Sequence, residues 1–152
     1  MGRTIALDYG ERRIGVALSD PTRTIGSPLV TLERKAGKRP PWPEIRRLIT
    51  ENEVDEAVVG LPLGLDGEEG PWAAEVRAFG ADLERRTGLP VHWIDERMTS
   101  VRAERVVRGM GLKRSQREEK GRVDATAAAL ILESYLTHRR RRADAEEERA
   151  DG

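Results

Sequence analysis

The sequence predicts one α/β domain in which helices cover the faces of a mixed β-sheet. Its 152 residues suit a single domain with one sizeable core. The chain opens with the pattern of a β-hairpin. Short apolar segments then alternate with segments whose apolar residues recur at helical spacing. An antiparallel start followed by this alternation predicts later strands that are parallel and joined by right-handed crossovers.

The first third of the chain predicts three strands. Residues 4–8 and 13–18 alternate between two faces and are joined by a turn at Gly10, whose missing side chain permits tight backbone conformations. A third strand is expected at residues 28–32. The segment 35–43 is rich in Lys, Arg, Gly and Pro and is expected to be a loop.

The middle of the chain predicts two helix–strand units. Proline is favoured at the first helical position, and Pro43 and Pro71 each precede a helical pattern. The second helix stops at Gly88. The strands between are short and continuously apolar, as expected when both faces are buried. The predicted helices span residues 43–52 and 71–87, and the predicted strands span 57–60 and 91–94.

The last third predicts two helices and a tail. Thr99 or Ser100 can cap a helix that runs to about residue 108. Ser115 and Glu118 have capping-box spacing and are expected to open the final helix. We therefore expect a domain over residues 1–138 and a charged tail over residues 139–152 that frays.

Composition excludes several classes of protein. The absence of cysteine excludes disulfides, thiolate metal sites and Cys nucleophiles. The sequence has no apolar run of the roughly 20 residues that a membrane span needs, and no signal-peptide pattern. A cytoplasmic protein without a membrane partner is therefore expected. With 27 Lys and Arg against 27 Asp and Glu, any attraction to nucleic acid must be local.

Carboxylates stand at three informative positions. Asp8 ends the first strand, where it can bond turn amides, and Gly15 and Ala17 leave space beside it if they face the same way. Asp95 and Glu96 follow the last strand, and their positions alone do not decide which of the two is the functional carboxylate. Asp124 lies in a helix that is otherwise apolar, where an unpaired carboxylate costs several kcal/mol.

Asp124 has two possible partners. Lys120, one turn earlier, would make a simple ion pair. A metal ion shared with the acids at the strand ends is the other. Such a set offers only oxygen ligands, which suit Mg²⁺ or Mn²⁺. Ions held this way activate water and neutralise charge during phosphodiester displacement.

Other side chains carry weaker signals. Glycines at 60, 64, 67 and 70 are expected to form turns, and Trp42, Trp72 and Trp93 are expected to be core or helix-entry anchors. Basic residues near the acids either stay solvated or contact phosphates. The candidates for phosphate contact are Arg13, Arg97, Lys113, Arg114, Arg117 and Lys120.

Four motifs stand in series along residues 4–137. They are Ala-Leu-Asp-Tyr-Gly-Glu-Arg-Arg-Ile-Gly-Val-Ala at 6–17, Val-Val-Gly-Leu-Pro-Leu at 58–63 with Gly67, Asp-Glu-Arg-Met-Thr-Ser at 95–100, and Val-Asp-Ala-Thr-Ala-Ala at 123–128 with Lys120. Together they resemble the YqgF family, whose members are described as pre-16S rRNA nucleases and as Holliday-junction resolvase-like proteins.

The resemblance implies an RNase H-like fold: a five-stranded mixed sheet in the order 3-2-1-4-5, with strand 2 antiparallel and helices on both faces. It implies that Asp8, Glu96 and Asp124 bind divalent metal, and it selects Glu96 over Asp95. We therefore expect a metal-dependent nuclease that cuts structured nucleic acid. Asp8, Glu96 and Asp124 would be its catalytic residues, holding one or two Mg²⁺ or Mn²⁺ ions. By resemblance, its substrate is precursor 16S rRNA during ribosome biogenesis, with ribosomal precursor particles as partners.

Two alternatives stay open. A Holliday-junction resolvase-like endonuclease acting on branched DNA needs two active sites and hence a homodimer. A ribosome- or nucleic-acid-binding module would keep the fold without turnover. Monomer and homodimer are both compatible with the sequence.

Overall fold

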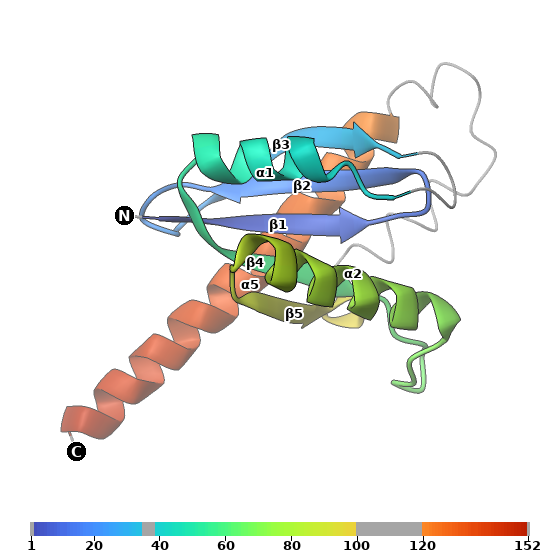
Figure 1. Ribbon diagram of the computed structural model, residues 1–152. Coiled ribbons are helices and arrows are strands. Elements are labelled where there is room, and N and C mark those ends of the chain that lie inside the picture. The colour runs from blue at the N-terminus through green and yellow to red at the C-terminus, as the bar shows by residue number, and fades with distance from the viewer. Residues whose placement is uncertain (1, 35–38, 100–119, 152) are drawn as a thin grey trace.

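The protein is a five-stranded sheet covered by helices on both faces (Figure 1). The computed structural model describes residues 2–34, 39–99 and 120–151. The strands are β1 (Arg3–Tyr9), β2 (Arg13–Ser19), β3 (Gly26–Glu33), β4 (Val54–Leu61) and β5 (Val91–Asp95). The helices are α1 (Trp42–Glu51), α2 (Pro71–Thr87), the 3₁₀ turn η1 (Glu96–Met98) and α5 (Lys120–Asp151).

The sheet has the order β3-β2-β1-β4-β5, which confirms the predicted topology. β2 is antiparallel to both β1 and β3, and β4 is parallel to both β1 and β5. The register aligns Asp8 with Gly15 on β2, and Leu7 with Val59 on β4. The carboxyl ends of β1, β4 and β5 therefore lie at one end of the sheet.

Alternate side chains of β1 contribute to two separate hydrophobic cores, one on each face of the sheet. Ile5 and Leu7 pack with residues of α1 and α2 on one face. Ala6 packs on the other face, against small and branched residues of α5 such as Ala128 and Ile131. Figure 1 shows α1 and α2 in front of the sheet and α5 crossing behind it. Asp8, two residues after Ala6, therefore belongs to the α5 face.

The contact between α2 and β5 depends on a glycine. A Cβ at Gly80 would lie 2.4 Å from Cη2 and 2.5 Å from Cζ2 of Trp93. The indole is also held by Arg77, whose guanidinium lies 4.8 Å from the ring centroid. Trp93 is thus a packing anchor, as expected, and the missing side chain at Gly80 makes room for it.

Replacing Gly80 with alanine should destabilise the fold. Alanine favours a helix over glycine by about 1 kcal/mol. The overpacking against Trp93 costs about 1–3 kcal/mol and outweighs that gain. Urea denaturation of the Gly80→Ala variant should therefore show a lower midpoint, whereas a midpoint above that of the parent chain would contradict this packing.

The C-terminal segment differs from expectation. The helix expected at residues 99–108 and the cap at Ser115 and Glu118 lie outside the described residues. The tail is helical, since α5 continues to Asp151 with residues 139–150 exposed, and its fraying stays a prediction. Its Ala, Arg and Glu residues have high helix propensity, and the packed part of α5 already supplies the helix nucleus. Of the described helices, none is long and apolar enough to cross a membrane.

A network around Glu56 holds α5 to the sheet near the amino ends of β1 and β4, away from Asp8. The Glu56 carboxylate accepts hydrogen bonds from Thr4 Oγ1 at 2.6 Å and from Tyr135 Oη at 3.0 Å. Arg23 Nε lies 3.3 Å from it and Arg139 Nε 3.5 Å. We call this group the Glu56 cluster; its members are Thr4, Arg23, Glu56, His92, Tyr135 and Arg139.

The cluster shifts two pKa values in opposite directions. Burial acts to raise the pKa of the Glu56 carboxyl, but the bonds from Thr4 and Tyr135 and the charges of Arg23 and Arg139 outweigh it and lower that pKa. Burial and the neighbouring Glu56 charge raise the pKa of Tyr135 to about 12. Ionised Glu56 therefore stabilises the fold, and ionised Tyr135 would destabilise it.

Replacing Glu56 with glutamine should lower the free energy of unfolding at pH 7 by about 1–3 kcal/mol, because charged partners lose their carboxylate. Since folding lowers the Glu56 pKa, its contribution is present above the ordinary value of 4.5 and is lost as the pH falls through the folded pKa. Urea denaturation at pH 7 and pH 3 should show the difference shrink at pH 3. Glu51→Gln, in an exposed pair with Arg47, is the control and should change little.

Candidate active site

Asp8 lies at the carboxyl end of β1 and is buried, with 5% of its surface exposed. Its partner on β2 is Gly15. On the other side, the alignment of Leu7 with Val59 places Gly60 of β4 beside it. Asp8 is thus flanked on both neighbouring strands by residues without side chains. Gly15 is thus the register partner of Asp8, whereas Ile131 and Glu96 occupy the place that a side chain at Gly60 would take.

Glu96 directly follows β5 and is 4% exposed. Its Oε1 lies 2.9 Å from where a Cβ of Gly60 would stand, and Cδ1 of Ile131 lies 2.5 Å from that point. The Glu96 carboxylate therefore sits over Gly60, on the face that α5 covers. Since adjacent strands are about 4.8 Å apart, the structure brings Asp8 and Glu96 together at one end of one face.

Asp95 has a different task from Glu96. Its carboxylate accepts a hydrogen bond from the Arg97 backbone N–H at 2.9 Å and caps η1. It also binds the Arg97 side chain, with Nη2 2.7 Å from Oδ2 and Nε 3.0 Å from the same atom. This bidentate pairing raises the pKa of Arg97 above its ordinary value. Asp95 thus orients Arg97, which is consistent with Glu96 as the ligand candidate.

Asp124 lies on α5, whose described residues pack on the same sheet face as Asp8 and Glu96. The side chains of residues 120–124, including Lys120, lie outside the described part of the chain. Position 124 precedes Ala128 by four residues and Ile131 by seven, which is the spacing of one helix face. Among the described side chains, no three His, Cys, Asp or Glu residues form a metal-binding group.

The structure describes two of the predicted phosphate contacts. Arg13 opens β2 at the same end of the sheet as Asp8, with 28% of its side chain exposed and Nε 4.0 Å from Oε1 of Glu33. Arg97 is 34% exposed and leans on the loop after β4, with Nη1 3.4 Å from the Cβ position of Gly67. Residues Lys113, Arg114 and Arg117 lie outside the described ranges.

Gly60 is the site residue whose role was misread in the sequence. Gly64 and Gly67 do form the expected turn, in which the Gly67 N–H donates to the Gly64 carbonyl at 2.9 Å and Gly67 has a φ of 84°. Gly60 instead lies within β4 and makes room for Glu96 and Ile131. A glycine inside an apolar strand is the signal for such a close approach.

Comparison with known proteins shows the family to which the chain belongs. A family model named RuvX, described as a Holliday junction resolvase, matches residues 2–138. The chain belongs to the RuvX family. A RuvX relative from Roseiflexus sp. (strain RS-1), named "Putative pre-16S rRNA nuclease", is 44% identical over 91% of this chain and 96% of its own. A relative of the same name from Koribacter versatilis (strain Ellin345) is 46% identical over 91% and 88%. This is the same family that the four motifs resemble under the name YqgF, so that prediction is confirmed.

Solved structures agree on the fold of this RuvX chain. RuvC from T. thermophilus, in complex with a Holliday junction substrate, superposes with a TM-score of 0.52 over 91% of this chain and 96% of its own, at 18% identity. A second Thermus thermophilus RuvC structure gives a TM-score of 0.50 over 90% and 95%. Together with the strand order, this confirms the predicted RNase H-like fold.

Proposed function

We propose that this RuvX protein is a divalent-metal-dependent nuclease whose catalytic residues are Asp8, Glu96 and Asp124. The observation that carries the proposal is the position of the Glu96 carboxylate, over Gly60 and beside Asp8. Both acids are buried on the sheet face covered by the helix that contains Asp124. Family membership supports nuclease activity, and the acids supply the metal dependence.

The residues present fit Mg²⁺ or Mn²⁺. Their donors are carboxylate oxygens, which these hard cations prefer. Asp8 and Glu96 lie on the sheet face that α5 covers, and the missing side chain at Gly60 lets the Glu96 carboxylate lie there. Both carboxylates are buried at one end of one face, where a cation would offset their negative charge. When bound, the ion supplies charge neutralisation for the scissile phosphate and a water of lowered pKa.

The other roles follow from charge. Asp8 and Glu96 orient the reacting groups from the sheet, and Asp124 does so from the helix. Without positive charge these acids repel a phosphodiester. Arg97, held in place by Asp95, and Arg13 lie at the same end of the sheet as Asp8 and would bind flanking phosphates. Lys113, Arg114, Arg117 and Lys120 complete the proposed phosphate contacts.

The proposed substrate is precursor 16S rRNA, within ribosomal precursor particles in the cytoplasm. The names of the curated relatives support this assignment. Arginine residues that bind phosphates are compatible with structured RNA.

Replacing Asp124 with asparagine tests the proposal. Asparagine preserves shape but removes the charge, so cleavage of a precursor rRNA fragment in Mg²⁺ or Mn²⁺ should be abolished. The circular dichroism spectrum should not change, and EDTA should stop the parent enzyme. Normal cleavage by Asp124→Asn in the same metal ion would show that the acid is misassigned.

A second candidate is junction resolution, favoured by the description of the family model. Symmetric cutting of a four-way DNA junction needs two active sites. Analytical ultracentrifugation with and without a four-way junction separates the candidates. A dimer that cuts the junction symmetrically supports resolution, and a monomer that cuts only rRNA excludes it.

A further inference from the structure

A groove of about 360 Å³ follows one side of α5, the helix that crosses behind the sheet in Figure 1. Apart from Thr99, its lining residues all belong to α5, at positions 130, 133, 134, 137, 138 and 141. Intervals of three and four residues keep side chains on one side of a helix. We call this surface the α5 groove; at 1.5 Å per residue it extends for about 16 Å.

The α5 groove begins beside Glu96. Thr99 Oγ1 donates a hydrogen bond to the Glu96 carbonyl oxygen at 3.0 Å, and the Thr99 N–H donates to the same oxygen at 3.2 Å. Leu130 directly precedes Ile131, whose Cδ1 lies 2.5 Å from the Cβ position of Gly60. That position is also 2.9 Å from Oε1 of Glu96. The groove therefore continues from the acids on the side of the sheet that α5 covers.

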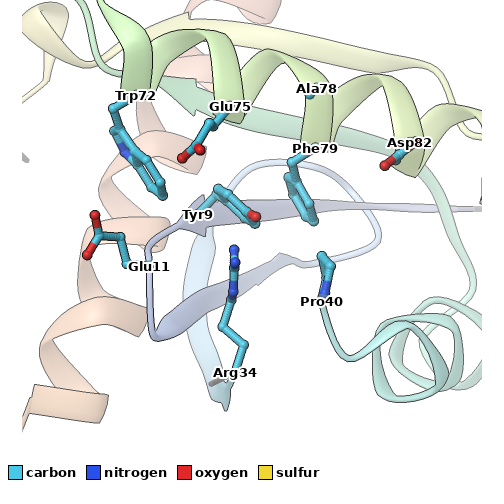
Figure 2. A pocket seen from close by; sticks show the side chains of 9 residues that line it. All are labelled: Tyr9, Glu11, Arg34, Pro40, Trp72, Glu75, Ala78, Phe79 and Asp82. Carbon is cyan, nitrogen blue, oxygen red and sulfur yellow. The ribbon is translucent and has the colours of Figure 1, made fainter. Parts of the chain in front are cut away.

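The cavity on the other face of the sheet has a different place. It measures about 530 Å³ and lies beside the rings of Tyr9, Trp72 and Phe79, which stack on one another (Figure 2). Tyr9 follows Asp8 in β1, so its side chain points away from the face of the acids. Of the two, the α5 groove is therefore the one that a strand held at the acids can enter directly.

Arg141 supplies positive charge at the far end of the groove. The neighbouring Arg139 is bound in the Glu56 cluster. Arg140 Nη2 donates a hydrogen bond to the Thr24 carbonyl oxygen at 3.5 Å. Arg141 instead lines the groove, is exposed, and makes no hydrogen bond or ion pair with any residue that the structure describes. Its guanidinium is therefore available to an anion.

Two further donors line the groove before Arg141. Ser134 and His138 lie one turn apart on α5, and their side chains make no hydrogen bond with residues in the described ranges. A hydroxyl, an imidazole N–H and a guanidinium can all donate to phosphate oxygens. The groove thus presents a row of donors, each without an acceptor of its own in the described part of the chain.

Carboxylates limit how an anionic chain can lie here. Glu133 lines the groove, and Asp144 and Glu148 continue the same side of α5 past Arg141. These carboxylates repel phosphates, so the closest approach of an anion is at Arg141. A basic peptide would pair with Glu133 but leave Arg141 without an acceptor, because Lys and Arg side chains only donate.

We propose that the α5 groove binds the phosphate backbone of an RNA strand that extends from the acids, with Arg141 as its main phosphate contact. Guanidinium and phosphate pair by two parallel hydrogen bonds. The groove spans about five phosphates of one strand at 3.4 Å each. Backbone contacts fix the register of a strand and do not read its sequence. The inference rests on the proposed function in taking the nuclease substrate as the ligand.

Fluorescence anisotropy with labelled oligouridine RNA tests the charges of the groove. The full chain is titrated in EDTA, so that no cleavage occurs. Arg141→Met should weaken binding at least about fivefold and lower the slope of log K against log salt by about 0.7, the value for one phosphate of a single strand. Glu133→Gln should tighten binding, because it removes a repulsive charge. The matched controls Arg47→Met and Glu44→Gln, on exposed positions of α1, should change neither quantity.

Hydroxyl-radical cleavage tests where the RNA lies. Because the chain has no cysteine, Thr137→Cys creates a unique attachment point for an iron chelate in the groove. Radicals produced there should cut the bound RNA. The same chelate on Glu44→Cys, on the helix α1 across the sheet, should leave it intact. All variants should keep the parent circular dichroism spectrum.

The opposite results overturn the inference. It is wrong if Arg141→Met binds RNA as tightly as Arg47→Met, or if the chelate at position 137 cuts no RNA. Weaker binding by Glu133→Gln would assign the groove to a cationic partner. Asp8→Asn should keep the RNA affinity that depends on Arg141. A parent chain that binds RNA in this way but cleaves none with any metal ion would contradict the nuclease proposal alone.

Discussion

Replacing Asp8 with asparagine should reduce metal-dependent cleavage by about a thousandfold or more. A metal ion supplies several kcal/mol of transition-state stabilisation, and each 1.36 kcal/mol is a factor of ten in rate. Asparagine keeps the shape and hydrogen-bonding capacity of Asp8 at a position that is 5% exposed, but it removes one of two neighbouring negative charges. The rate should therefore fall while the fold survives.

Thermal unfolding separates the loss of metal from the loss of fold. In EDTA, Asp8→Asn should, like the parent chain, unfold in one cooperative transition, because asparagine preserves the shape of Asp8. Mn²⁺ should raise the melting temperature of the parent and not that of the variant. A variant stabilised by Mn²⁺ as strongly as the parent would remove Asp8 from the proposed metal ligands, whatever its activity.

Replacing Gly60 with alanine should damage stability and cleavage together. The added Cβ would lie 2.5 Å from Ile131 Cδ1 and 2.9 Å from Glu96 Oε1, so α5 or the Glu96 carboxylate must move. Overpacking of this kind costs about 1–3 kcal/mol. A misplacement of about 1 Å at reacting groups costs about a hundredfold in rate. Urea denaturation and a cleavage assay measure the two effects.

Gly70→Ala is the matched control for this substitution. A Cβ at Gly70 would meet nothing within 4 Å, and its φ of −82° suits any residue. The control should therefore behave like the parent chain in both assays. If Gly60→Ala also cleaves at the parent rate, the close packing of Glu96 over β4 does not matter for catalysis.

Local patterns explain why the fold could be predicted. Each of the five strands was located within a few residues, since apolar alternation and the punctuation by Gly and Pro are local signals. The continuation of α5 through the tail was not predicted. The segregated charges were taken as a sign of fraying, and the high helix propensity of the same residues was not weighed.

Contacts between distant segments explain what could not be predicted. The expected strand began at residue 57, so Glu56 gave no sign of its place among partners from β1, β5 and α5. Trp72 packs against the core as the expected anchor, but its place beside Tyr9 of β1 and Arg34, which follows β3, could not be predicted (Figure 2). Of the acids, Asp8 and Glu96 do converge, whereas the meeting of Asp124 with them stays a prediction.

The long helix α5 is anchored to the sheet at a point far from the proposed catalytic residues. Position 124 and Arg139 are fifteen residues apart on one uninterrupted helix, about 22 Å at 1.5 Å per residue. Arg139 forms an ion pair with Glu56 and Tyr135 donates a hydrogen bond to it, at the end of the sheet away from Asp8. The Glu56 cluster therefore anchors the same helix that carries position 124, at the end of the sheet away from Asp8.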